Sequence, residues 1–261
     1  MSFPVGIHQN ITNTEYHADE AVSSSFAKTA YAKTIAHAEA QKNNFTTTPA
    51  MQLGTAVHSL FLENIAPING GATRRGKAWI NAQIKAEELN TTPLNSADYE
   101  KCHEMVKALK NNPVIGKFVR NKLRKIEHSM FAEHSTGLRI KCRPDMYFDN
   151  GIVCDVKTTV NADPHIFTRQ IVGPLSYHIQ AAWYITVMRL CGLHADRFMF
   201  LNVEKGPPFA TSVVELSPHM LEHSISLVEW LIPKIQKANE SQLYTTGWPE
   251  IHVAELPDWA V

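Results

Sequence analysis

The sequence of 261 residues contains no run of about 18 apolar residues, the length that a membrane-spanning helix needs. Its first stretch, MSFPVGIHQNITNTEYH, lacks the basic region and following apolar region that are typical of a signal peptide. We therefore expect a cytoplasmic protein that makes no contact with membranes.

An excess of either charge is also missing, because 25 lysines and arginines balance 25 aspartates and glutamates. The chain therefore has no global basic signal for a polyanionic partner. A local basic stripe or bound metal ions can still meet phosphates on a neutral protein, so a nucleic-acid partner stays open. With 44% hydrophobic and 19% charged residues, the chain can bury one sizeable core.

Cysteine is scarce, and no two cysteines form a CxxC pair. This spacing argues against a zinc ribbon or a thiol redox motif, and buried free thiols are the simpler interpretation. The four residues are Cys102, Cys142, Cys154 and Cys191.

The hydrophobic pattern predicts helices first, then three strands, a helix, two strands and a final helix. After an irregular lead, we expect helices at about 23–43, 51–64, 78–89, 95–112, 176–192 and 219–241, and strands at about 125–134, 137–148, 151–160, 196–205 and 209–217. This order predicts an α/β or α+β fold with a mixed sheet in the middle. We expect one domain over 1–261, with a helical part at about 20–120, a sheet and helix at about 124–215, and a C-terminal helix at about 218–241.

The stretch RPDMYFDNGIVCDVKTT, residues 143–159, places two carboxylates and a lysine around a probable turn. A three-residue loop at 149–151 would set Asp145 directly opposite Asp155. A two-residue turn at 150–151 would instead put the two carboxylates on opposite faces, because a slip of one residue inverts every side chain. The chemistry of this stretch therefore depends on the register of the hairpin.

Two carboxylates opposite each other on a sheet need a proton, a neighbouring cation or a bound metal ion. Mg²⁺ or Mn²⁺ suits such a pair, and Lys157, on the same face as Asp155, could orient or deprotonate a water that attacks a phosphate. The alternative is that Asp145 ends one strand, Asp155 and Lys157 form an exposed ion pair, and nothing binds.

Two further motifs flank the hairpin. GTAVH places His58 one helical turn after Gly54, where the missing side chain leaves room for an ion or a neighbouring strand. QAAWY places Gln180 and Tyr184 on one face of a helix. Taken singly, a helical histidine is usually structural and a Q-x-x-x-Y pair is frequent by chance.

In this order, GTAVH, RPD, DVKTT and QAAWY resemble the RecE-type exonucleases (exonuclease VIII), a branch of the PD-(D/E)xK nuclease superfamily. The resemblance covers most of the chain and fades after about residue 205. It implies a restriction-endonuclease-like fold with a mixed central β-sheet flanked by helices. It also implies Mg²⁺-dependent, ATP-independent degradation of linear double-stranded DNA from 5′ to 3′ by a homotetrameric ring, which leaves 3′ single-stranded tails for homologous recombination. The partner that it implies is a RecT-type single-strand annealing protein.

The resemblance also assigns roles to single residues. The implied metal ligands are His58, Asp145, Asp155 and Val156, and the implied catalytic residues are Lys157, Asp155, Asp145, Gln180 and Tyr184. Glu127 sits where related nucleases often carry an additional acid, which we place behind the direct ligands. Candidate DNA contacts are Ser25, Lys28, Arg74, Arg75, Lys77 and Thr158. For the basic residues the alternative is a solvated surface charge, and for the serines at 23–25 it is capping of a helix.

Some relatives in this superfamily bind an iron–sulfur cluster with one upstream cysteine and three downstream ones. Cys191 is the only cysteine after the lysine motif. We therefore expect no cluster. Two alternatives to a RecE-type enzyme stay open at this point, namely a RecB-type or CRISPR-associated repair nuclease of other polarity, and a DNA-end-binding protein without catalysis.

Overall fold

The computed structural model describes residues 2–44, 46–244, 251 and 253–254. The N-terminal half is mostly helical: β1 (Gly6–His8), α1 (Asn13–Ala18), α2 (Ser24–Ala32), α3 (Ile35–Asn43), α4 (Pro49–His58), the π-helical turn η1 (Ser59–Glu63), β2 (Ile68–Asn69), α5 (Gly76–Glu88), β3 (Pro93–Leu94), α6 (Ser96–Asn111) and α7 (Ile115–Arg120). Then come β4 (Lys125–Ile126), β5 (Ser129–Glu133), β6 (Arg139–Cys142), β7 (Met146–Tyr147), β8 (Gly151–Thr159), α8 (Pro164–Ile166), η2 (Phe167–Val172), α9 (Tyr177–Leu190), β9 (Ala195–Glu204), β10 (Thr211–Glu215) and α10 (Pro218–Ser241). None of the helices in the described residues is both long and apolar enough to cross a membrane.

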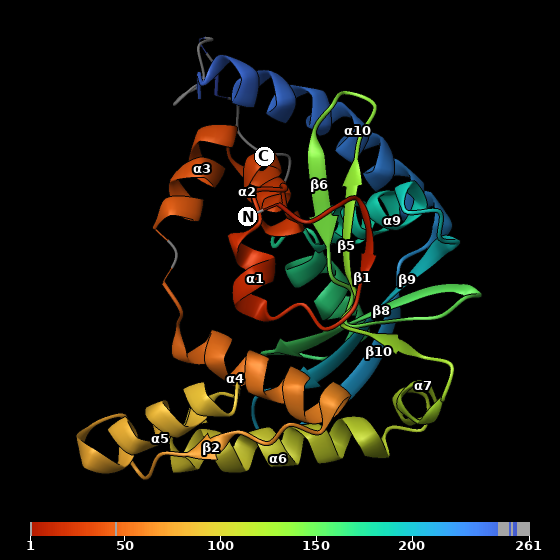
Figure 1. The fold of residues 1–261 in the computed structure, drawn as a ribbon. Helices are drawn as coiled ribbons and strands as arrows, with labels where there is room; N and C mark the ends of the chain where they lie inside the picture. Colours follow the sequence, from red (N-terminus) through yellow and green to blue (C-terminus); the bar gives the residue numbers. More distant parts are fainter. Residues whose placement is uncertain (1, 45, 245–250, 252, 255–261) are drawn as a thin grey trace.

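A mixed five-stranded sheet in the order β10-β9-β8-β7-β4 forms the centre of the fold. Within this sheet, β8 and β9 form the one parallel pair, and α9 lies in the crossover that joins them. Residues of β8 alternate between the two faces: Val153 packs with α9 and α10, whereas Cys154 and Val156 pack with α4 and α6. In Figure 1, α4, α5 and α6 lie together at one end of the molecule and α10 runs along the other. The predicted mixed sheet between helices is confirmed.

The hairpin between β7 and β8 has the three-residue loop. Met146 pairs with Cys154, and Tyr147 pairs with Val153. The loop closes at Gly151, whose φ of +88° is open to glycine and strained for other residues. The same register sets Asp145 opposite Asp155, so the first of the two registers considered from the sequence is correct.

Two of the predicted strands are each broken in the middle. The stretch 125–134 divides into β4 and β5, and the stretch 137–148 divides into β6 and β7. The two halves of each stretch belong to different sheets, since β4 and β7 are part of the five-stranded sheet whereas β5 and β6 form a separate three-stranded sheet with β1. Glu127 takes a left-handed conformation in the first break (φ +53°), and Pro144, which has no N–H for a ladder, lies in the second. The prediction of two continuous strands was therefore wrong at these two points.

Two predictions for the N-terminal part were also wrong. The single helix expected at 23–43 is two helices, α2 and α3, since the chain turns at Lys33 (φ −133°, ψ −105°) and Thr34 caps α3 through the His37 N–H. The lead before residue 23, expected to be irregular, forms β1 and α1.

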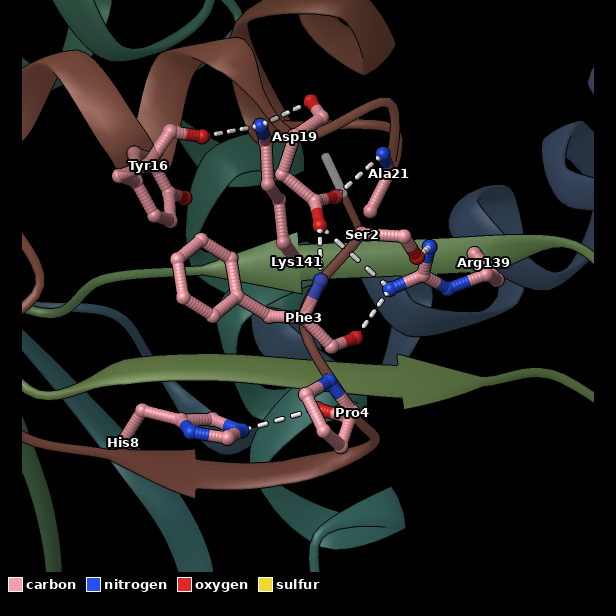
Figure 2. Close-up of polar contacts among 9 residues, drawn as sticks. All are labelled: Ser2, Phe3, Pro4, His8, Tyr16, Asp19, Ala21, Arg139 and Lys141. Carbon is pink, nitrogen blue, oxygen red and sulfur yellow. Dashed lines mark hydrogen bonds and ion pairs between the residues drawn. The ribbon is translucent and has the colours of Figure 1, made fainter.

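Buried charges fasten this N-terminal segment to the three-stranded sheet (Figure 2). The Asp19 carboxylate accepts hydrogen bonds from the backbone N–H groups of Phe3 (2.8 Å) and Ala21 (2.7 Å). The Lys141 ammonium, which projects from β6, donates to the carbonyl oxygens of Tyr16 (2.5 Å) and Asp19 (2.7 Å). Because Lys141 is buried and pairs with the end of α1, this helix keeps a fixed place beside the sheet.

Candidate functional site

A cleft with a volume of about 1710 Å³ opens where both strand breaks meet the N-terminal helices. Residues of α1, α2, α3 and α4 line it, together with Glu127 from the first break and Arg143 and Asp145 from the second. Figure 1 shows the helices that supply these lining residues, with α1, α2 and α3 above α4 in this view. Both breaks therefore turn an acidic side chain out of the sheet and into one cavity.

His58 reaches this cavity from the last turn of α4. Thr48 caps the start of the helix and Pro49 occupies its first turn, so His58 lies at the opposite end beside β8. Gly54 faces this strand, and a Cβ atom there would lie at an ordinary contact distance of 3.5 Å from Thr158 Oγ1. A neighbouring strand is therefore present beside Gly54, as the sequence suggested, but the space there does not require a glycine.

The carboxylates of Glu127 and Asp145 form a cluster with the His58 ring. One possible ligand atom from each residue lies within 4.8 Å of the others. His58 Nε2 donates to the Val156 carbonyl oxygen (2.8 Å), since a carbonyl can only accept. Its Nδ1 atom faces the cluster, 3.2 Å from Asp145 Oδ2. Two carboxylates and one imidazole nitrogen are ligands that suit a hard divalent cation.

The protonation of this cluster reflects its burial and its charges. Burial raises the pKa of Glu127 to about 8, and the charge of Asp145 adds to the effect. Burial opposes ionisation of Asp145 too, but His58, Lys157 and the Val156 N–H at 2.6 Å outweigh it and lower its pKa. Burial likewise opposes the charge on His58, yet Asp145 raises the pKa of the imidazole to about 9. The raised pKa values of Glu127 and His58 mean that protons neutralise part of the negative charge of the cluster. A bound metal ion would supply the same positive charge.

Asp155 lies next to this cluster and is held from two sides. Its Oδ1 atom accepts a hydrogen bond from Gln180 Nε2 (2.7 Å), and the Lys157 ammonium lies 2.5 Å from Oδ2. Burial disfavours the charge on Lys157, but Asp155 outweighs it and raises the pKa of the lysine. Both oxygens of the Asp155 carboxylate are therefore held in place by groups of the protein itself.

Gln180 and Tyr184 both project from α9 toward this region. Gln180 contacts Asp155 directly, whereas Tyr184 is buried and its ring packs edge-on against Phe198 at a centroid distance of 6.1 Å. Burial raises the pKa of Tyr184 well above its usual value, and the charges of Asp155 and Asp145 add to it. The structure therefore brings the motif together with the acids and places Tyr184 in a packing role behind them.

The predicted DNA contacts fall into two groups. Ser25 and Lys28 line the cleft from α2. The nearby Ser23 caps α2 by accepting from the Phe26 N–H (3.5 Å). For this serine, helix capping is therefore the alternative that the structure supports. Thr158 directly follows Lys157 on β8, and its hydroxyl faces Gly54 of α4.

The basic loop residues lie elsewhere. Arg74 already has its partners within the protein. Its guanidinium pairs with Asp98 (2.9 Å), hydrogen-bonds to Gln52 and lies over the Trp79 ring. The other two, Arg75 and Lys77, are exposed at the start of α5 and do not line the described cleft.

Sequence reasoning missed two features of the site. Glu127 was placed behind the direct ligands, whereas its carboxylate belongs to the cluster itself. Arg143 was quoted in the RPD motif without a role, but it hydrogen-bonds to Ser129 Oγ (2.9 Å), Asn13 Oδ1 (2.7 Å) and the Ile11 carbonyl oxygen (3.0 Å). It thereby ties the two strand breaks to the N-terminal segment, and the only signal in the sequence was its place two residues before Asp145.

Residues 23–247 match the model of a family described as a PDDEXK-like domain of unknown function (DUF3799). The chain belongs to this family. The match includes α10, which lies beyond the part of the chain where the RecE-like motifs fade. The PDDEXK-like assignment places the chain in the nuclease superfamily that the motifs predicted, and no curated protein matches the sequence.

Solved structures with the same fold include the crystal structure of a "putative exonuclease" from Eubacterium rectale. It aligns with a TM-score of 0.65 and 17% sequence identity over 90% of this chain and 89% of that chain. A phage-related exonuclease from Haemophilus somnus 129PT aligns over 78% of this chain and 89% of that chain, with 13% identity and a TM-score of 0.33. The first of these likenesses supports the PDDEXK-like fold of the chain.

Proposed function

We propose that this PDDEXK-like protein is a metal-dependent exonuclease that degrades linear double-stranded DNA. The observation that carries the proposal is one cluster, His58, Glu127 and Asp145, that lines the cleft, with the buried Asp155 and its partner Lys157 from the same hairpin beside Asp145. A surface hairpin would leave these side chains in solvent, but both aspartates are buried. Buried acids beside a lysine at the edge of a cleft are suited to hydrolysis of a phosphodiester.

The residues that would hold the metal are His58, Glu127 and Asp145, with Asp155 as their neighbour. Mg²⁺ fits such oxygen ligands, and Mn²⁺ fits both these and the imidazole. When bound, the ion supplies positive charge for the phosphoryl oxygens and a water of lowered pKa. Glu127 then has a direct part in this proposal, rather than the supporting part that its sequence position suggested.

The protein's own groups fix the orientation of the site. The Val156 N–H holds the Asp145 carboxylate, and the Gln180 amide holds the Asp155 carboxylate. Lys157 sits on the same side of β8 as Asp155 and carries the charge that could bind a phosphoryl oxygen or position a water. Because these donors are in place before substrate arrives, little reorganisation would be needed during the reaction.

The finer points of the proposal rest on the resemblance to RecE-type exonucleases. They are 5′-to-3′ polarity, production of 3′ tails for recombination in the cytoplasm, a homotetrameric ring, and a RecT-type annealing protein as partner. The GTAVH, RPD, DVKTT and QAAWY motifs support them, since the residues of all four motifs meet at the cleft or directly behind it.

The proposal is tested by the release of acid-soluble nucleotides from linear duplex DNA after addition of Mg²⁺. We expect the wild-type protein to release nucleotides, and Asp155→Ala and Lys157→Ala to lose release while melting cooperatively. Duplexes labelled at one end or the other give the polarity, and we expect the 5′ label to be released first. Full activity in either variant would sink the assignment, and tight binding of DNA ends without release by the wild type would favour an end-binding protein.

A further inference from the structure

Two lysines from distant parts of the chain meet at the same pair of protein groups. Lys28 of α2 and Lys157 of β8 both donate to Gln180 Oε1, at 3.3 Å and 3.2 Å. Both ammonium groups also lie over the Tyr177 ring, 5.0 Å and 4.5 Å from its centroid. An amide oxygen and an aromatic face can attract two cations, but neither carries a full negative charge.

The charge balance of this pair is incomplete. Lys157 has Asp155 as its counter-ion. For Lys28, no carboxylate of the described residues lies within ion-pair distance, and its hydrogen bond to the neutral Gln180 amide leaves further N–H donors of the ammonium unused. Burial lowers the pKa of Lys28 to about 8, and the nearby Lys157 adds to this effect, whereas the more distant charge of Asp155 opposes it without forming an ion pair. A half-buried cation without a counter-ion is costly unless an anion from outside completes it.

Lys28 also lines the cleft, so an anion in the cleft can reach it. We propose that Lys28 and Lys157, over the shared Tyr177 ring, form a binding site for one backbone phosphate of the substrate DNA. A phosphate offers several oxygens and can accept from two ammonium groups at once, which a single carbonyl does less well. The inference rests on the proposed function for the identity of the substrate. It assigns Lys28, so far a candidate DNA contact, to one phosphate shared with Lys157, and it adds Tyr177 to the site.

The test measures DNA binding without catalysis. Fluorescence anisotropy of a labelled 30-base-pair duplex, titrated in EDTA at several salt concentrations, gives both affinity and its salt dependence. We expect Lys28→Gln to weaken binding about tenfold and to reduce the slope of log K against log salt by about 0.9, as for one lost phosphate contact. Lys85→Gln removes an exposed lysine of α5 outside the cleft and serves as the matched control, for which we expect no change.

A second measurement keeps the wild-type sequence and so does not depend on how the variant folds. Lysine acetylation of the wild-type protein is followed by mass spectrometry with and without the duplex, and we expect DNA to protect Lys28 and not Lys85. Unchanged affinity and slope in Lys28→Gln, or equal acetylation of Lys28 with and without DNA, overturns the phosphate site. These results are separable from the proposed function, because that is judged by Mg²⁺-dependent nucleotide release from the wild type and from Asp155→Ala and Lys157→Ala, and not by DNA binding in EDTA.

Discussion

Lys28 and Arg74 are both partly buried cations of the helical N-terminal half, yet their surroundings differ. Arg74 has its charge neutralised by Asp98 and its remaining donors used by Gln52, so it is complete within the protein. Among the residues that the structure describes, the Lys28 ammonium contacts a neutral amide and an aromatic ring and forms no ion pair. A basic residue that binds an external anion is therefore recognised by the lack of a counter-ion in the structure. A basic run in the sequence is a poorer guide, since one of the three basic residues of the RRGK run, Arg74, is already paired with Asp98.

The largest expected effect, on metal affinity and DNA digestion, separates Asp145 of the cleft cluster from Asp98, the partner of Arg74. Asp145→Asn removes a charge from the cluster with His58 and Glu127, so we expect affinity for Mn²⁺ to fall at least about tenfold and DNA digestion by about a hundredfold or more. Asp98→Asn removes the partner of Arg74 and leaves the cluster intact. Isothermal titration with Mn²⁺ checks both. Equal metal affinity in the two variants would break the comparison.

A smaller effect is expected at Arg143, which ties the start of β5 to the N-terminal segment. Arg143→Gln loses hydrogen bonds to Ser129, Asn13 and Ile11 and the stacking on the Tyr16 ring, where the guanidinium lies 4.2 Å from the centroid. We expect the free energy of unfolding to fall by about 2–3 kcal/mol, measured with urea. Arg143→Lys should recover only part of it, because an ammonium lacks the planar fork. Full recovery by lysine would show that charge alone matters there.

The smallest effect on activity is expected at Arg74. Arg74→Gln leaves Asp98 without its counter-ion, so we expect a loss of about 1–3 kcal/mol in the free energy of unfolding and little change in DNA digestion at a temperature where the variant is folded. Thermal unfolding and nucleotide release are measured on the same preparation. Loss of digestion at unchanged stability would place Arg74 on the DNA and remove the distinction from Lys28.

The sequence predicts the hairpin well because local rules govern it. A glycine at the end of a short turn between alternating strands predicts the hairpin and limits it to two registers, of which the structure selects the one that sets Asp145 opposite Asp155. The four-residue spacing of Gln180 and Tyr184 likewise suffices to put both on one face of α9. These are the parts of the site whose geometry depends on residues close together in the chain.

The parts that escaped prediction depend on distant contacts. Glu127 enters the cluster because its backbone turns left-handed between two sheets, and residue type gives no sign of this. Pro144 was a visible signal for the second break, since it cannot donate to a ladder, but the alternating pattern on both sides favoured one strand. Lys28 and Gln180 are separated by 152 positions in the sequence, so only the packing of α2 against α9 brings them together.

The central claim, that the two strand breaks and α4 build a metal centre, is tested most directly by a crystal structure determined with Mn²⁺ and a short duplex. We predict an ion bound to the carboxylates of Asp145 and Glu127 and to His58, beside Asp155. Binding of Mn²⁺ only at other residues, with Glu127 and Asp145 free of metal at saturating concentration, would contradict the account.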